Sequence, residues 1–255
     1  MKRLLSISAM MVVAATLSYT ATAQTTVTSV NVVGFQVNDV LKDKPLSLVA
    51  FPFVAIDSDQ SITNLLGGQL TPGSNVGDAD TISFWDAGAQ SYQRVYRSVF
   101  NGNEWADSSN PFGVTTQELF IGRAFWVRSN NGAADQVLNM SGEIVTDNTV
   151  TQQVIAGLNL LSYPYNAEVS MTNTTLSASM TPGSNLGDSD TISIWDVDTQ
   201  SYIRYYRSVF AGNQWAASSD PFTPVDLKIQ MGQGFWLNRQ AAGAFTWTET
   251  KPYSL

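Results

Sequence analysis

The sequence predicts an all-β protein built from two tandem homologous units, each an antiparallel β-sandwich or barrel-like fold with at most one short helix. The first observation is an internal repeat: residues 71–112 align without a gap on residues 181–222, with 30 of 42 positions identical. The second is the alternation of apolar and polar residues in DTISFWD and DTISIWD, which is typical of half-buried strands. The third is the frequency of turn residues between short apolar runs, which favours sandwiches and barrels.

The first 23 residues are predicted to be a secretory signal peptide that lies outside the fold. Met1-Lys2-Arg3 is a positively charged start, an apolar stretch follows, and Ala21-Thr22-Ala23 matches a small-x-small cleavage signal. The apolar stretch is shorter than the roughly 20 residues that a membrane-spanning helix needs. We therefore expect export and no membrane span after cleavage, with an extracellular or cell-surface location and the periplasm as the alternative.

The rest of the chain is predicted to divide into a first β repeat, residues 24–145, and a second β repeat, residues 146–255. The similarity continues on both sides of the identical block, since LSLVAFPF mirrors LNLLSYPY and GRAFWV mirrors GQGFWL. Each unit is then about 110 residues long, which is the size of a domain and exceeds a short solenoid repeat.

Local residue types predict the elements of each unit in order. A short helix is expected over residues 61–66, stopped by Gly67-Gly68. Pro72-Gly73 fits a type II turn, in which the glycine takes a positive φ. A strand over 81–86 then leads through a hairpin loop opened by its last aspartate into a strand over 91–100. Neither face of that second strand is cleanly apolar, which favours a position at an edge or an interface.

The composition excludes several kinds of chemistry. The chain has no Cys and no His, so it has no disulfides, no thiolate nucleophile and no histidine-containing triad. It has 21 Asp and Glu against 13 Lys and Arg, which argues against a nucleic-acid partner. Glu104 and Asp107 become Gln214 and Ala217 in the second unit, so the two units share no acid pair there. We expect no enzymatic activity.

The order of the motifs resembles a functionally uncharacterised group of secreted, two-repeat bacterial proteins. The residues that carry the resemblance are the signal peptide, VNVVGFQV, the strands LSLVAFPF and LNLLSYPY, the DTIxxWD hairpins, the GxxFW strands and the terminal AGAFTWTET. The resemblance covers nearly the whole mature chain and implies an exported all-β tandem, with no catalytic residues. The run VYRSVFNGNEWADSSNPF and its copy are longer than the resemblance implies.

Two repeated acidic pairs are candidate calcium ligands, because hard carboxylate oxygens are the ligands that Ca²⁺ prefers. A D-x-D sequence at the start of a strand is also a common solvated turn, and the full EF-hand pattern is missing. We expect no cofactor, with calcium as the alternative at Asp78, Asp80, Asp188 and Asp190.

Aromatic residues that recur in both units are the stronger candidates for binding, because a ring combines an apolar face with a polar tip and can stack on sugars or anchor a partner. Arginines are interleaved with them. The alternative is that most of the rings fill the core of a protein that lacks disulfides. The candidate residues for partner or glycan binding are Trp85, Tyr92, Tyr96, Arg97, Trp105, Trp195, Tyr202, Tyr206, Arg207 and Trp215.

Two classes of function remain after these exclusions. The sequence favours a noncatalytic structural protein of the cell surface or extracellular matrix that self-assembles through β edges, with itself or other surface proteins as partners. The alternative is a glycan-binding or adhesive module with one aromatic site per repeat and a polysaccharide as its partner.

Overall fold

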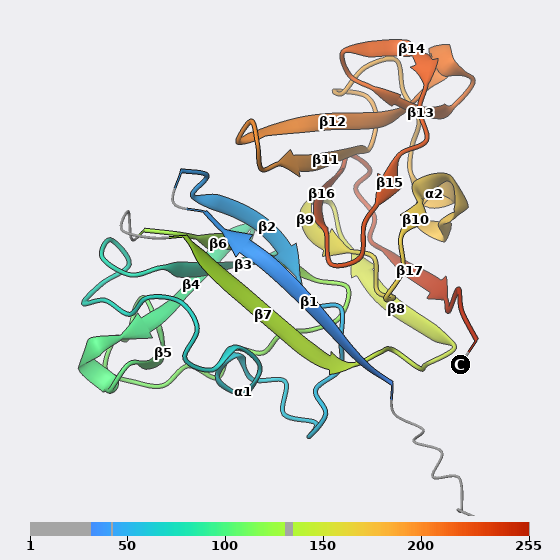
Figure 1. Ribbon diagram of the computed structural model, residues 1–255. Helices are drawn as coiled ribbons and strands as arrows, with labels where there is room; N and C mark the ends of the chain where they lie inside the picture. The colour runs from blue at the N-terminus through green and yellow to red at the C-terminus, as the bar shows by residue number, and fades with distance from the viewer. Residues whose placement is uncertain (1–31, 42, 131–134, 255) are drawn as a thin grey trace, which may run out of the picture. The chain divides into compact units, whose positions relative to one another are not determined.

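Each repeat is built on one large antiparallel sheet, as Figure 1 shows for the computed structural model. The structure describes residues 32–41, 43–130 and 135–254, so the predicted signal peptide lies outside the described residues. The sheet of the first repeat has the strand order β2-β6-β3-β4-β5, and that of the second has the order β14-β13-β12-β11-β16-β9.

The first repeat contains seven of the strands in the described residues, one α-helix and one short 3₁₀ segment. Their bounds are β1 Val33–Val40, β2 Leu46–Ala50, α1 Ile62–Leu66, β3 Thr81–Asp86, β4 Ser91–Ser98, η1 Val99–Asn101, β5 Glu104–Asp107, β6 Ala124–Arg128 and β7 Gln136–Glu143.

The second repeat follows the same order and adds three strands and one 3₁₀ segment. Its elements are β8 Thr149–Val154, β9 Gly157–Ser162, β10 Val169–Ser170, η2 Met171–Asn173, α2 Thr175–Ser179, β11 Thr191–Asp196, β12 Ser201–Ser208, η3 Val209–Ala211, β13 Gln214–Ala217, β14 Asp220–Pro224, β15 Lys228–Ile229, β16 Gly234–Arg239 and β17 Phe245–Thr250.

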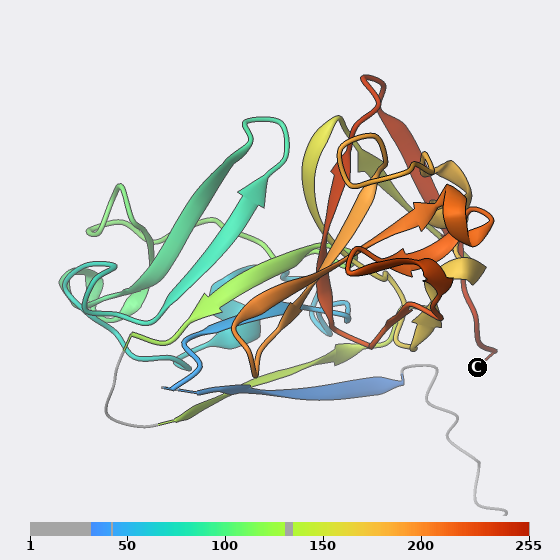
Figure 2. The ribbon, with the colours of Figure 1, turned by 90° about the horizontal axis from the view of Figure 1, so that it is seen from above.

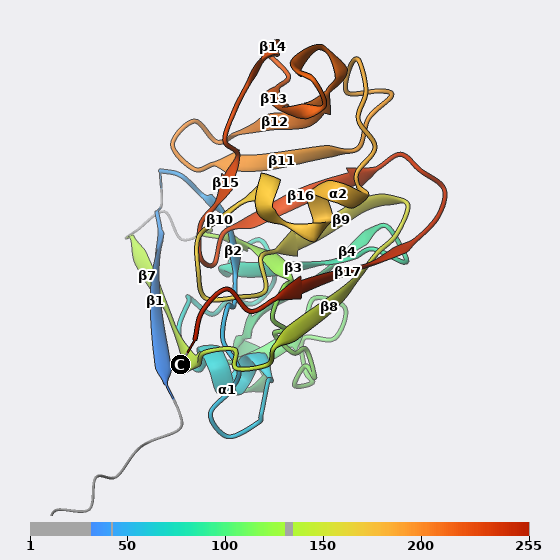
Figure 3. The ribbon, with the colours of Figure 1, turned by 90° about the vertical axis from the view of Figure 1, so that its right-hand side faces the viewer.

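The predicted all-β fold of two sandwich-like units is confirmed, and in the described part of the chain no sheet closes on itself. A two-stranded ribbon accompanies the large sheet of each repeat. In the first repeat β1 pairs with β7, and in the second β8 pairs with β17, which Figure 3 shows lying side by side. The described residues belong to one compact unit. Among the described residues, no helix combines the length and the apolar character needed to cross a bilayer.

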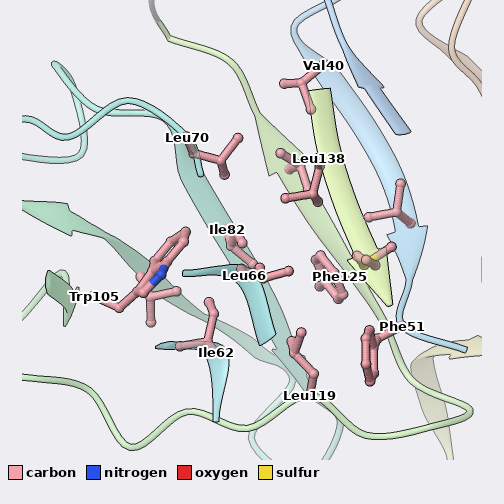
Figure 4. Packing of buried hydrophobic residues seen from close by; sticks show 14 of the residues in the cluster. Val40, Phe51, Ile62, Leu66, Leu70, Ile82, Trp105, Leu119, Phe125 and Leu138 are labelled. Atoms are coloured by element: carbon pink, nitrogen blue, oxygen red, sulfur yellow. The ribbon is translucent and has the colours of Figure 1, made fainter. Parts of the chain in front are cut away.

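The core of the first repeat lies between the ribbon and the sheet. Leu138 and Met140 of β7 are fully buried and belong to the same cluster as Ile82 of β3 and Phe125 of β6. Figure 4 shows Ile62 and Leu66 of α1 among the same buried side chains, with Leu66 beside Ile82. Buried apolar area of this kind is the dominant stabilising term in a chain without crosslinks.

The predicted helix is present and is held by its capping residue. Ser61 has an extended backbone, and its hydroxyl oxygen accepts a hydrogen bond from the N–H of Asn64 at 3.2 Å. This satisfies one of the amide groups that the first turn of a helix leaves unpaired. Ile62 and Leu66, one turn apart, are both fully buried.

The predicted type II turn at Pro72-Gly73 is wrong, because Gly73 is not among the glycines with a positive φ. Its backbone instead continues the sheet: the N–H donates to Arg97 O at 2.9 Å, and its O accepts from Val99 N at 3.1 Å. A Cβ at this position would lie 2.7 Å from the nitrogen of Ala79. The glycine is therefore required by close backbone approach and not by a left-handed conformation.

The strand predicted over 91–100 has polar and apolar residues on both faces, but the cause is not a position at the edge of the sheet. The strand β4 lies inside the sheet, between β3 and β5, and its last predicted residues form η1. Val95 points into the core of its own repeat, whereas Trp236 of the other repeat contacts the ring of Tyr92. The predicted position at an interface therefore describes this strand, whereas the alternative position at a sheet edge is wrong.

The two repeats approach each other closely at two small residues in equivalent positions, Ala124 of β6 and Gly234 of β16. A Cβ added to Gly234 would lie 2.5 Å from the Cβ of Ala124 and 2.8 Å from the Cγ of Leu48. Both distances are shorter than a van der Waals contact, so the glycine sets how closely the repeats can pack.

Substitution of this glycine is expected to lower stability. We predict that Gly234→Ala reduces the free energy of unfolding by about 1–3 kcal/mol, because overpacking forces neighbouring atoms apart. Urea denaturation monitored by fluorescence measures the change. The matched control is Gly243→Ala, where an added Cβ meets nothing within 4 Å. Equal stability of the two variants would contradict close packing at this point.

Candidate binding site

The hairpin between β3 and β4 of the first repeat reaches across to β9 of the second. The indole N–H of Trp85 donates to the carbonyl oxygen of Leu158 at 2.8 Å. Gln90, at the end of the same hairpin loop, donates to this oxygen at 3.0 Å and accepts from the N–H of Leu158 at 3.0 Å. The exposed backbone groups of an edge strand are thereby paired.

The second repeat makes the same contacts in return. Trp195 donates to the carbonyl oxygen of Leu46 at 3.0 Å, and Gln200 donates to it at 3.1 Å and accepts from its N–H at 3.2 Å. Trp85 and Gln90 of the first repeat are thus equivalent to Trp195 and Gln200 of the second. These equivalent contacts define a pseudo-two-fold relation between the repeats. We call this region the junction; in Figure 2 the repeats lie side by side along it.

Six aromatic rings pack at the junction, three from each repeat. Trp85 meets Trp236 with ring centroids 5.1 Å apart and an interplanar angle of 82°, and Trp126 meets Trp195 at 5.0 Å and 86°. These are edge-to-face pairs, the geometry that the charge distribution of aromatic rings favours. Tyr92 and Tyr202 lie beside them and remain 42% and 37% exposed, so part of each ring faces solvent.

Two pockets flank these rings, and their linings correspond residue by residue. The first pocket has a volume of about 360 Å³ and the second about 550 Å³, both within the range of small-ligand sites. Tyr92 and Tyr202 line both pockets, so the pockets adjoin. The first is also lined by Leu46, Val76, Thr81, Ser83, Arg94, Trp126, Arg128 and Trp195. The second is also lined by Trp85, Leu158, Leu186, Thr191, Ser193, Arg204, Trp236 and Asn238.

Each pocket therefore combines an aromatic wall built by both repeats with hydroxyl and guanidinium groups, and the second pocket adds the amide of Asn238. Partial burial raises the pKa of the Tyr202 phenol, and a 3.0 Å hydrogen bond from the indole of Trp236 to its oxygen partly offsets that increase. Burial likewise raises the pKa of Tyr92. Both hydroxyls are therefore protonated at neutral pH and are available as donors and acceptors.

The structure brings four of the ten predicted binding residues together at the junction: Trp85, Tyr92, Trp195 and Tyr202. It places the two other tryptophans inside the repeats. Trp105 is 1% exposed and donates to Gly67 O at 2.9 Å, and Trp215 is 2% exposed and donates to Ser177 Oγ at 3.0 Å. Their rings have no face open to a ligand.

The remaining four predicted residues bind the chain itself. The hydroxyls of Tyr96 and Tyr206 lie 3.4 and 3.2 Å from the carbonyl oxygens of Ser74 and Ser184. Arg97 donates to the carbonyl oxygens of Gly68, Leu70 and Asn103, and Arg207 donates to those of Ser177, Met180 and Asn213. These side chains fasten loops onto the sheets.

The four predicted calcium ligands also have partners within the chain. Asp80 is fully buried and accepts from the backbone N–H groups of Thr71 and Asn130, each at 2.8 Å. Asp190 accepts in the same way from the N–H groups of Thr181 at 2.9 Å and Gln240 at 2.7 Å.

Asp78 and Asp188 lie in the preceding loops. Asp78 accepts from the side chains of Ser74 and Asn75, and a hydrogen bond from Ser184 lowers the pKa of Asp188. No cluster of three or more acidic side chains suited to a metal occurs in the described part of the chain.

Sequence reasoning missed two exposed phenylalanine pairs, one per repeat. Phe100 and Phe112 are 53% and 72% exposed, with centroids 5.3 Å apart, and Phe210 and Phe222 repeat this arrangement at 5.2 Å. Their recurrence within the identical block was the available signal. Sequence reasoning also missed that each pocket is lined by residues of both repeats. No sequence feature of one repeat indicates which strand of the other repeat it contacts.

Comparisons with protein-family models, with curated proteins and with solved structures found no match to this chain.

Proposed function

We propose that this is an exported, noncatalytic protein that binds saccharide rings in the two junction pockets. The observation that carries the proposal is that the same set of side chains is assembled twice: two tyrosines, two tryptophans, an arginine, a threonine and a serine line each pocket. The signal-peptide pattern and the resemblance to secreted proteins support export.

A sugar ring matches this kind of lining. Its C–H faces can stack on tyrosine and tryptophan rings, while its hydroxyl rim needs hydrogen-bonding groups around them. Thr81 and Ser83 in the first pocket, and Thr191 and Ser193 in the second, supply those groups next to the rings. Two adjoining sites on one compact unit would also bind a polymer more tightly than either site alone.

Removal of the two exposed rings is expected to weaken binding without unfolding the protein. We predict that wild-type protein binds immobilised glycans on an array, and that Tyr92→Ala with Tyr202→Ala weakens binding at least about tenfold, since aromatic anchors dominate binding energy. The matched control is Phe100→Ala with Phe210→Ala, which removes two other rings that are each 53% exposed. A blank array for the wild type, or equal binding by the tyrosine variant, would contradict the proposal.

Self-assembly is the second candidate function, and the outer face of the β1–β7 ribbon favours it. Val33, Phe35, Val37 and Val137 are each between 46% and 63% exposed on this face. The equivalent ribbon of the second repeat presents Thr149, Thr151 and Gln153 opposite further threonines. The fold therefore does not require an apolar surface here, and contiguous apolar patches commonly mark interaction sites.

Sedimentation of the purified protein tests self-assembly. If this candidate is right, the sedimentation coefficient rises with concentration, and Phe35→Lys with Val37→Lys keeps the protein monomeric because charges on an apolar face block association. The control pair Thr149→Lys with Thr151→Lys places the same charges on the other ribbon and should leave association unchanged. A wild type that is monomeric at every concentration would remove this candidate.

A further inference from the structure

The charged residues of the two junction pockets are all basic, although the protein is acidic. The chain carries 21 Asp and Glu against 13 Lys and Arg. Arg94 and Arg128 nevertheless line the first pocket and Arg204 lines the second, with no carboxylate in either lining. A neighbouring hollow, lined by Phe84 and Gln117 among others, does contain carboxylates, those of Asp86 and Glu118. The absence of acids is thus a property of the aromatic pockets and not of every hollow on the described surface.

The pocket arginines differ from the other arginines on the same strands. In β4, the guanidinium of Arg97 donates to three backbone carbonyl oxygens, and in β12 that of Arg207 does the same. The guanidinium groups of Arg94 and Arg204 make no ion pair or hydrogen bond with any described residue, and both side chains are exposed. Each strand therefore has one arginine that holds the fold and one that is available at a pocket.

An available guanidinium beside an aromatic wall suits a planar anion attached to a ring. Guanidinium groups bind carboxylates through two parallel hydrogen bonds, which fixes the orientation of the ligand as well as its charge. The surplus of carboxylates elsewhere on the protein repels an anionic polymer, so the binding of one requires a local positive group. Arg94 and Arg204 supply one such group per pocket, in equivalent positions.

We propose that the junction pockets bind hexuronate residues of an acidic polysaccharide, with the sugar ring against Tyr92 or Tyr202 and its carboxylate on Arg94 or Arg204. This inference rests on the proposed saccharide-binding function and names its ligand class.

The two pockets are not equal. Arg128 at the rim of the first pocket is replaced by Asn238 in the second, and Arg128 donates to the side chain of Asn130 at 3.0 Å, which limits its freedom. The first pocket therefore offers two positive groups and the second offers one. The first pocket binds the uronate more tightly, so the titration resolves into two unequal sites.

Calorimetric titration of the mature protein with tetragalacturonate and with the neutral cellotetraose tests this inference. We expect tetragalacturonate to bind more tightly and its affinity to fall as salt is added, because the ion pairs are partly exposed. Arg94→Gln with Arg204→Gln should weaken tetragalacturonate binding about tenfold or more and leave cellotetraose unchanged. The control Arg123→Gln removes one positive charge from an exposed arginine that lines neither junction pocket, and it should leave tetragalacturonate binding nearly unchanged.

The outcomes separate this inference from the function on which it rests. Equal binding of the two oligosaccharides, unaffected by the arginine substitutions, would overturn the choice of an acidic ligand and leave saccharide binding intact. Tighter binding of a sulfated oligosaccharide than of tetragalacturonate would overturn the choice of a carboxylate. No binding of any of the three would overturn the proposed function itself.

Discussion

The reciprocal hydrogen bonds between hairpin side chains and edge strands at the junction are the constraint on which the rest of the arrangement depends. The strands β2 and β9 are each the last strand of a sheet and would otherwise expose unpaired backbone groups along their sequences. At Leu158 both the N–H and the carbonyl oxygen are paired by Trp85 and Gln90, and at Leu46 by their equivalents. Each repeat thus covers the edge of the other, and neither edge is covered within its own repeat at these residues.

This exchange explains why the pockets lie where they do. A tryptophan that reaches across the junction places its ring beside the tryptophan of the other repeat's GxxFW strand, and the tyrosines of β4 and β12 close the group. Close approach of the backbones at Ala124 and Gly234 brings these rings into contact. A pocket wall built in this way requires both repeats, so a single repeat would lack half of each lining.

Much of the fold could be predicted from the sequence, because period-two alternation, turn residues and the Ser61 cap act locally. The duplicated architecture follows from the same local patterns occurring twice. The conformation at Pro72-Gly73 could not be predicted. The glycine is constrained by backbone pairing with a strand segment about 25 residues away in the chain and not by its own neighbours.

The site was only partly predictable for a related reason. Trp85 and Trp105 look alike in the sequence, since each lies on a short strand, but the first ring reaches the other repeat and the second fills the core of its own. Arg94 and Arg97 are likewise similar in sequence and only three residues apart, but Arg94 lines a pocket and Arg97 bonds to the backbone of its own repeat. Which of two similar side chains is buried depends on which surfaces meet, and single-chain periodicity does not carry that information.

Amide hydrogen exchange of β9 in a variant altered only in the first repeat tests the central claim most directly. Trp85→Phe with Gln90→Ala keeps a ring at the junction but removes both side chains that bond to Leu158. If the repeats hold each other's edges, exchange at the N–H of Leu158 becomes faster than in the wild type, while exchange in the more distant β13 changes little. Unchanged exchange at Leu158 would contradict the account, because it would mean that this N–H is protected without the hairpin side chains of the first repeat.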